Sequence, residues 1–88
     1  MSDTPLDVLD VLVIGAGISG LTTAFRLARG GLRVAVVEAA GRVGGAIQTH
    51  VDGPWRFELG PNTVVENHET VGRLIRDAGL DGEKVVAA

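Results

Sequence analysis

Cysteine is absent from this sequence, and basic residues, aromatic residues and long apolar stretches are scarce. Without cysteine the chain contains no disulfide framework, no thiolate ligand for a metal and no thiol nucleophile. The 8 Lys and Arg residues are outnumbered by 11 Asp and Glu, which gives a formal net charge of -3 at pH 7. Because the sequence encodes no clustered basic surface, we expect no nucleic-acid partner.

No apolar stretch approaches the ~18 residues that indicate a membrane span, so at most a peripheral membrane contact is expected. The segment Met1–Asp10 carries three Asp and no basic residue, the opposite of a signal or transit peptide, and residues 2–7 predict a frayed lead-in. These features predict a cytoplasmic protein. The 88 residues suffice for one small domain with a thin core.

The first half of the chain predicts two strands joined by a helix. Val8–Ile14 is short and rich in β-branched residues, as in a strand buried on both faces of a parallel sheet. Apolar residues then recur at helical spacing over Ile18–Arg29, and the Gly30–Gly31 pair ends the helix. Leu32–Val37 is a second strand, so the order is that of a βαβ unit.

The second half predicts a hairpin followed by a helix. Ile47–Val51 and Trp55–Leu59 flank Asp52–Pro54, which has the composition of a β-turn. Apolar spacing then predicts a helix over residues 67–78, with Gly79 as its C-cap. The expected fold class is α/β: a Rossmann-type βαβ unit with an incomplete parallel sheet, a short β-hairpin and a second helix.

Glycine is abundant, with 13 in 88 residues against a usual ~7%, and part of the excess forms a motif. Gly15-Ala16-Gly17-Ile18-Ser19-Gly20 matches G-x-G-x-x-G directly between the predicted strand and helix. In that context Gly15 allows a tight turn, Gly17 lets the backbone approach a pyrophosphate, and Gly20 lets the helix pack closely on the strand. The alternative is a purely structural glycine turn.

An acidic residue follows at the expected distance. Glu38 lies eighteen residues after Gly20 at the end of the second predicted strand, close to the ~20-residue offset at which a carboxylate meets ribose hydroxyls. A carboxylate there also repels a 2′-phosphate, which argues against NADP. The alternative is a solvated strand-end carboxylate, and at this point NAD and FAD fit equally well.

A second glycine-rich loop separates these two cofactors. Gly41-Arg42-Val43-Gly44-Gly45 begins only three residues after Glu38, where a simple nicotinamide-binding domain needs no such loop. Arg42 has the planar fork that matches phosphate oxygens, and we expect it to clamp the phosphate of a longer ligand. The alternative for Arg42 is an ordinary surface arginine.

Together these segments resemble the N-terminal FAD-binding segment of the flavin-containing amine oxidase superfamily. The resemblance rests on Val13–Leu21, Val36–Ala39 and the loop Gly41–Gly45. Ile47–Thr49 and Phe57–Thr63 look most like the branch of protoporphyrinogen and coproporphyrinogen oxidases. The resemblance covers most of the chain, so the chain is expected to be the N-terminal part of an FAD-binding Rossmann-like domain, residues 1–88, without its substrate domain.

The resemblance implies which residues bind FAD. It assigns the first glycine motif to the diphosphate, Glu38 to the adenosine ribose, the second glycine loop to the diphosphate and ribityl chain, and residues 60–62 to the flavin ring. One departure is Ala46, where the family often has a cation. The implied cofactor-binding residues are Gly15, Gly17, Ile18, Ser19, Gly20, Glu38, Ala39, Arg42, Gly44, Gly45, Gly60, Pro61 and Asn62.

The implied function is oxidation of a porphyrinogen with oxygen in heme biosynthesis, with the porphyrinogen as small-molecule substrate of the full-length enzyme. The alternatives are a superfamily member acting on an amine or a carotenoid, and a dinucleotide-binding fragment with no activity. No catalytic residue or metal site is predicted, because flavin itself takes the hydride. His50 and His68 are assigned surface or packing roles, and Glu66–Glu69 is expected to cap a helix rather than hold a metal.

The first predicted strand would lie at the centre of a complete doubly wound sheet. In this chain it finds one partner strand and short segments from residues 47–59. We therefore expect an open sheet edge, self-association of the isolated chain, weak FAD binding and no oxidase turnover.

Overall fold

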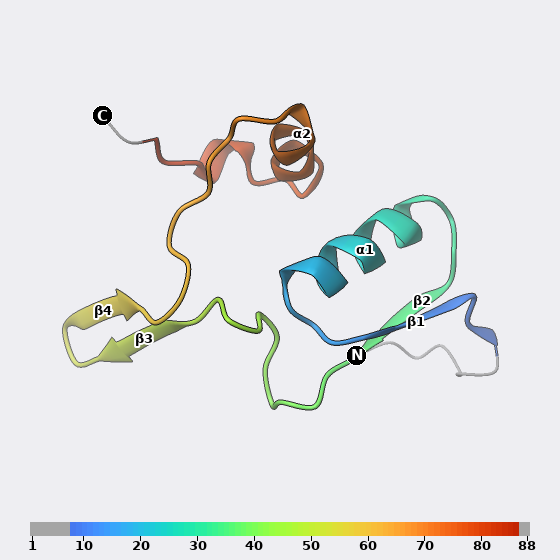
Figure 1. Cartoon of the computed structure of the whole chain (residues 1–88), viewed down its shortest axis with the longest axis horizontal. Coiled ribbons are helices and arrows are strands. Elements are labelled where there is room, and N and C mark those ends of the chain that lie inside the picture. The colour runs from blue at the N-terminus through green and yellow to red at the C-terminus, as the bar shows by residue number, and fades with distance from the viewer. Residues whose placement is uncertain (1–7, 87–88) are drawn as a thin grey trace.

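The structure is a computed structural model that describes residues 8–86, so the lead-in predicted for residues 2–7 lies outside the described residues. The elements in chain order are β1 (Val11–Ile14), α1 (Ile18–Arg29), β2 (Val34–Val37), β3 (Thr49–Asp52), β4 (Trp55–Glu58), α2 (Glu69–Asp77) and the 3-10 turn η2 (Asp81–Glu83). They form two separate two-stranded sheets, β1–β2 and β3–β4, and two α-helices (Figure 1).

The βαβ unit predicted from the sequence is confirmed. Strands β1 and β2 run parallel, in register from Val11 opposite Val34 to Ile14 opposite Val37, and α1 covers one face of this sheet (Figure 1). Pairing between β1 and β2 begins at Val11, later than predicted, because the Asp10 carboxylate binds the backbone of the partner segment just before that point. Oδ2 of Asp10 accepts a hydrogen bond from the backbone N–H of Arg33 at 2.7 Å, and its carboxylate also binds the Arg33 guanidinium.

Helix α1 has the bounds that the sequence predicts, and its end explains why. Gly31 adopts a left-handed φ of 93°, and its N–H donates to the carbonyl of Ala28. The N–H of Leu32 donates to the carbonyl of Leu27. This pair of bonds is a Schellman motif, which satisfies the last carbonyls of the helix and turns the chain toward β2.

The predicted hairpin is present but stands apart from the parallel sheet. Strands β3 and β4 pair antiparallel, from Thr49 opposite Glu58 to Asp52 opposite Trp55, across a turn that contains Gly53. Neither strand joins β1, whose second edge therefore carries no strand among the described residues. The hairpin projects away from the βαβ unit (Figure 1).

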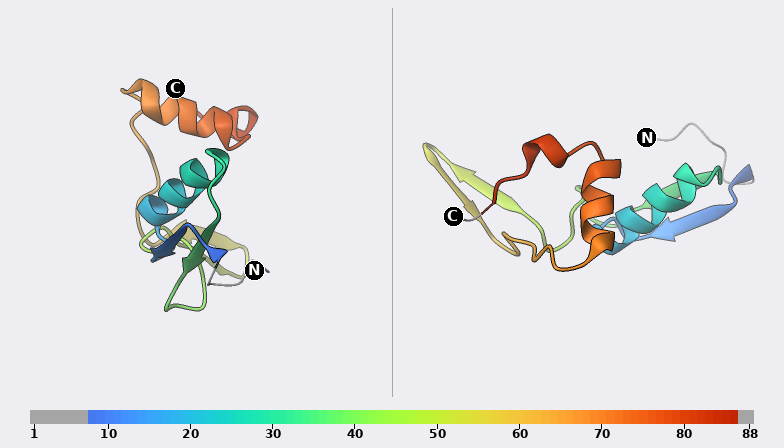
Figure 2. Two further views of the ribbon diagram at one scale, coloured as in Figure 1. Left: turned by 90° about the vertical axis from the view of Figure 1, so that its right-hand side faces the viewer. Right: turned by 90° about the horizontal axis from the view of Figure 1, so that it is seen from above.

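Helix α2 lies on the side of α1 that faces away from the sheet, as both directions of view show (Figures 1 and 2). The two helices are joined near their C-terminal ends by Asp77. Its Oδ2 accepts from the Arg26 guanidinium at 2.5 Å, and its backbone carbonyl accepts from Arg29 at 2.9 Å. The hydrogen bond from Arg26 lowers the pKa of the Asp77 carboxyl.

The described part of the chain is open rather than compact. Its radius of gyration is 15.4 Å, whereas a compact domain of this length has about 12 Å. Ala16 and Ala24 are the buried apolar residues among those described, and Ile14 is 83% exposed. No helix within residues 8–86 combines the length and apolar character needed to cross a membrane. The thin core expected from the sequence is thus present, and much apolar surface faces solvent.

Candidate cofactor-binding site

The first glycine motif forms a tight turn between β1 and α1. Gly15 adopts a φ of 99°, which side-chain-bearing residues rarely adopt. A Cβ on Gly20 would overlap the carbonyl oxygen of Gly15, well inside van der Waals contact, and would also touch Val13. The helix can therefore start close to the strand only because residue 20 is glycine. This close approach is the role that the sequence predicted for Gly20.

The N-terminal end of α1 is left open by its side chains. The N-cap is Gly17, which has an extended conformation, and no side chain caps the helix. The first turn contains no acidic residue, and the first N–H of the helix that bonds inward is that of Leu21, to the carbonyl of Gly17. The preceding N–H groups point out of the helix with the positive end of its dipole. Such a helix end can bind an anion such as a diphosphate.

The peptide groups of Ala16 join three segments that are distant in sequence. Its N–H donates to Oε1 of Glu38 at 2.8 Å, and its carbonyl accepts from the N–H of Gly44 at 2.8 Å. The side chain of Ala16 is 1% exposed. The sequence did not single out this residue, because an alanine whose backbone makes the contacts leaves no chemical signature.

Glu38 reaches back from the end of β2 to the first glycine loop. Besides the bond from Ala16, its Oε2 accepts from the N–H of Ala40 at 2.7 Å. These two N–H groups lower the pKa of the Glu38 carboxyl below its usual range, with a smaller contribution from the charge of Arg42. A carboxylate has about four acceptor positions, so an ionised Glu38 can still accept from ribose hydroxyls. The ribose contact itself stays a prediction.

Arg42 makes its contacts within its own loop. One terminal nitrogen of the guanidinium donates to the carbonyls of Val43 and Ile47, at 3.2 and 3.4 Å. The other donates to the carbonyl of Gly45 at 2.8 Å and to Oε1 of Gln48 at 2.9 Å. The phosphate contact predicted from the sequence stays a prediction, while the structure gives this side chain partners that the sequence did not suggest.

The second glycine loop lies directly against the first. Besides the bond from Gly44 to Ala16, Gly45 packs on Gly17, and a Cβ on Gly45 would lie 3.2 Å from the Cα of Gly17. Gly60 approaches the same loop, because a Cβ there would overlap the carbonyl of Ala46. Residues from three predicted segments therefore meet around the start of α1.

An open cleft of about 780 Å³ lies at this meeting point. One wall comes from the first glycine motif, a second from the loop at residues 44–47, and a third from Pro61 and α2. No charged side chain lines it among the described residues. Of the residues predicted to bind FAD, those on the cleft are Gly15, Gly17, Ile18, Ser19, Gly20, Gly44 and Pro61.

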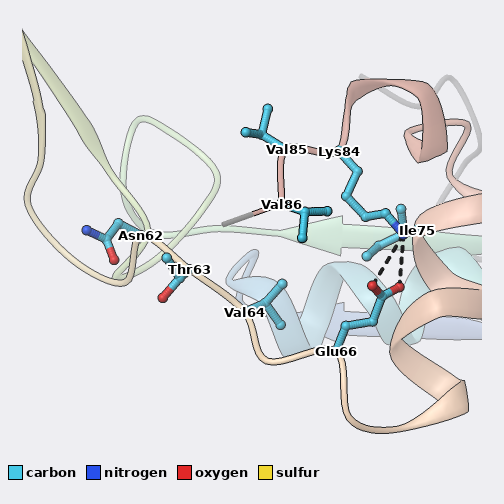
Figure 3. A pocket seen from close by; sticks show the side chains of 8 residues that line it. All are labelled: Asn62, Thr63, Val64, Glu66, Ile75, Lys84, Val85 and Val86. Carbon is cyan, nitrogen blue, oxygen red and sulfur yellow. Dashed lines mark hydrogen bonds and ion pairs between the residues drawn. The ribbon is translucent and has the colours of Figure 1, made fainter. Parts of the chain in front are cut away.

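The remaining predicted residues lie beside or away from this cleft. Glu38, Ala39, Arg42 and Gly45 are exposed and do not line it, and neither does the half-buried Gly60. Asn62 instead lines an adjacent cavity of about 480 Å³, which shares Thr63, Val64 and Ile75 with the cleft. Figure 3 shows that cavity between the chain leading to α2 and the C-terminal residues Val85 and Val86, with a Lys84–Glu66 ion pair at one side.

The two histidines of the chain lie on strand β3 and at the start of α2. Residues 8–86 contain no grouping of three or more His, Asp and Glu side chains that could hold a metal ion. Of the region Glu66–Glu69, His68 caps α2: its Nδ1 accepts from the N–H of Thr70 at 3.2 Å. His50 packs its ring against Phe57 across the hairpin. His50 thus has a packing contact, and the cap expected from the region Glu66–Glu69 comes from His68.

Comparison with known families gives a match over residues 13–78, to the model described as an NAD(P)-binding Rossmann-like domain. The matched region runs from β1 to the end of α2 and contains every residue predicted to bind cofactor.

Individual relatives are oxidases. The chain is 43% identical over 74 residues to an L-amino-acid oxidase of Echis ocellatus, covering 82% of this chain and 15% of that protein. It is 44% identical over 70 residues to protoporphyrinogen oxidase 2 of Arabidopsis thaliana, covering 80% and 14%. A putrescine oxidase structure with bound putrescine superposes with a TM-score of 0.72 at 38% identity, over 81% of this chain and 16% of that one. The chain thus spans about one seventh of the length of these relatives.

Proposed function

We propose that this chain, which belongs to the family of NAD(P)-binding Rossmann-like domains, binds the ADP portion of FAD in a flavin-dependent oxidoreductase. The resemblance to the flavin-containing amine oxidase superfamily is confirmed by its relatives, which include amino-acid, putrescine and protoporphyrinogen oxidases. Because the chain spans only 15% of such a relative, the activity of a whole protein is part of the proposal.

The observation that carries the proposal is the uncapped start of α1, enclosed by the second glycine loop. The N–H groups there need an acceptor that no side chain provides, and Gly17 and Gly45 keep the backbone accessible on that side. The ionised Glu38 lies next to this turn, where it favours ribose hydroxyls and disfavours a 2′-phosphate. A dinucleotide without a 2′-phosphate matches these features.

Bound FAD supplies the redox chemistry by accepting a hydride from the substrate. The described residues would bind and orient the cofactor: the start of α1 the diphosphate, Glu38 the ribose, and Gly60 and Pro61 the side nearest the flavin. The predicted role of Asn62 beside the flavin is part of this proposal, although its side chain lines a different cavity.

For the substrate we propose a porphyrinogen, oxidised with oxygen as a step of heme biosynthesis. Phe57–Thr63 and the 44% identity to a protoporphyrinogen oxidase support this choice. The second candidate is an amine or amino acid, which the L-amino-acid and putrescine oxidases among the relatives favour. The cytoplasmic location predicted from the sequence stays a prediction.

Titration of the purified chain with FAD, followed by quenching of flavin fluorescence, tests the cofactor. We expect FAD to bind more tightly than NADP, and Glu38→Ala to weaken FAD by roughly tenfold or more through loss of a charge-assisted hydrogen bond. Glu58→Ala, on the hairpin, is the matched control and should leave binding unchanged. Tighter binding of NADP than of FAD would refute the proposal.

We further propose that the isolated chain binds FAD weakly, associates with itself through the free edge of β1, and has no turnover. The open cleft and the exposed apolar surface support this. Sedimentation across a concentration series tests the association, and oxygen consumption with a porphyrinogen or an amine tests turnover. A monodisperse monomer that turns over substrate would contradict the proposal.

A further inference from the structure

Both terminal nitrogens of the Arg42 guanidinium already have acceptors in its own loop. Both terminal nitrogens donate twice, to three backbone carbonyls and one side-chain amide, at 2.8–3.4 Å. The two terminal nitrogens carry four hydrogens between them and have four acceptors in the loop, which leaves Nε–H as the remaining donor of the guanidinium. A phosphate bound by the same fork would have to displace partners that are already in place.

These bonds fix the segment that touches the first glycine motif. The carbonyls of Gly45 and Ile47 bind Arg42, and the N–H of Ile47 donates to the carbonyl of Gly44 at 3.0 Å. The N–H of Gly44 in turn donates to Ala16. The loop held by Arg42 therefore also holds the turn that positions the start of α1.

We propose that Arg42 is a positioning residue: it orders the second glycine loop against the first and acts on the cofactor through that loop, without contacting phosphate. The part that concerns affinity rests on the FAD binding proposed above. The part that concerns the loop holds for the protein without nucleotide, so the two can fail separately.

Two variants separate positioning from charge. Arg42→Lys keeps the positive charge but has one nitrogen, which cannot span four acceptors in a planar fork. Gln48→Met removes one acceptor of Arg42 and leaves its charge in place. A bidentate phosphate clamp predicts a loss of affinity in Arg42→Lys but none in Gln48→Met, because releasing the guanidinium from Gln48 maintains or tightens phosphate binding. A positioning role predicts a loss in both variants.

The experiment measures amide hydrogen exchange of Gly44 in the nucleotide-free chain, and then FAD affinity at several salt concentrations. We expect Gly44 to exchange at least tenfold faster in Arg42→Lys and Arg42→Gln, and about threefold faster in Gln48→Met. FAD affinity should fall about tenfold in both Arg42 variants and two- to threefold in Gln48→Met. The dependence of affinity on salt should stay that of the unmodified chain.

The N–H of Gly15, which donates to the carbonyl of Val37 at 2.8 Å, is the internal control. Its exchange should not change, because the β1–β2 ladder does not depend on Arg42. Unchanged exchange at Gly44, faster exchange at both glycines alike, or full affinity in Arg42→Lys would each overturn the proposal. If the unmodified chain binds no FAD, the proposed function fails, and the exchange at Gly44 still decides the positioning role.

Discussion

The two helices of this chain end in the same way and begin in opposite ways. Both end in a Schellman motif with a left-handed glycine, Gly31 after α1 and Gly79 after α2. Helix α2 begins with a side-chain cap from His68 and carries Glu69 in its first turn. Helix α1 begins at Gly17 with no side-chain cap and no acid.

This difference associates the uncapped start of α1 with the candidate site, because the chain does contain residues that can cap a helix. The same sequence caps α2 on both ends, so a capped α1 was chemically accessible. The counterpart in α1 of the N–H that His68 satisfies in α2 is available to an anionic ligand. The cost in helix stability is roughly a few tenths of a kcal/mol, because glycine is itself an acceptable N-cap. Substitutions at the two helix starts, at the glycines inside the helices and at Glu38 can test this comparison.

The largest effect is expected from giving α1 the acid that it lacks. Gly17→Asp adds a carboxylate where the diphosphate is proposed to bind. Residue 17 has a negative φ and a Cβ there would lie 3.9 Å from Gly45, so the fold tolerates the change. Like-charge repulsion should weaken FAD at least a hundredfold while the thermal midpoint is maintained or raised.

Gly17→Asn is the matched control for this experiment, because it has the same shape and capping ability without the charge. Titration with FAD should give a much smaller loss for Asn than for Asp. Equal losses would mean that space rather than charge limits this position, and that the open helix start is not an anion site.

The interior glycines of the two helices should respond differently to alanine. A Cβ on Gly20 would overlap the rigid carbonyl of Gly15, whereas one on Gly72 would meet only the tips of Glu66 and Arg76, at 3.2 and 3.6 Å. Chemical denaturation should show that Gly20→Ala costs about 2 kcal/mol. Gly72→Ala should be neutral or stabilise by up to about 1 kcal/mol through helix propensity. A similar loss in both variants would contradict the packing described here.

Removing the cap of α2 should affect stability alone. His68→Ala deletes the acceptor for the N–H of Thr70 and is expected to cost about 1 kcal/mol in denaturation, with FAD affinity unchanged. His68→Asn, which can also cap, should recover most of the stability. A change of FAD affinity in His68→Ala would show that the two helix starts are coupled.

The smallest effect concerns pH. The N–H of Ala16, foremost among several groups, lowers the pKa of Glu38 below its ordinary value of 4.5. A lowered folded-state pKa means that Glu38 contributes stability above 4.5 and that the contribution is lost as pH falls through the folded-state pKa. The difference in thermal midpoint between the unmodified chain and Glu38→Gln should therefore be constant near neutral pH and narrow in acid.

Two other carboxyls with lowered pKa, Asp10 and Asp77, are present in both proteins, so their titration cancels from this difference. A difference that stays constant into strong acid would show that the Glu38 charge does not hold the first glycine loop.

The parts of the fold that the sequence predicted are those determined by residues close together in the chain. The period of apolar residues and the glycines at either end defined α1 with correct bounds, because each signal lies within the helix or next to it. The strands β1 and β2 were predicted too long, since the end of a strand depends on where its partner strand stops pairing. Strand β1 starts at Val11, because the Asp10 side chain accepts the N–H of Arg33 just before it. The hairpin itself was predicted from its turn, but the fact that neither β3 nor β4 pairs with β1 depends on tertiary arrangement, which no local pattern encodes.

The same distinction holds for the candidate site. The glycines were predictable, because tight turns and close contacts restrict residue type. The acceptors of Arg42 were not, since a long flexible side chain selects its partners only after the loop has folded. The part played by Ala16 was also hidden, because its peptide group makes the contacts.

The burial of Ala16 restricts what the first variable position of the glycine motif can hold. Its Cβ is enclosed while both of its peptide groups are bonded, so a larger side chain could enter only by breaking one of those bonds. Ile18, in contrast, is 58% exposed. If every amino acid were tried at each place, position 16 would admit glycine, alanine and little else, while position 18 would admit many. The motif written G-x-G-x-x-G is therefore, in this chain, three consecutive small residues, two exposed positions that tolerate larger side chains, and a final glycine.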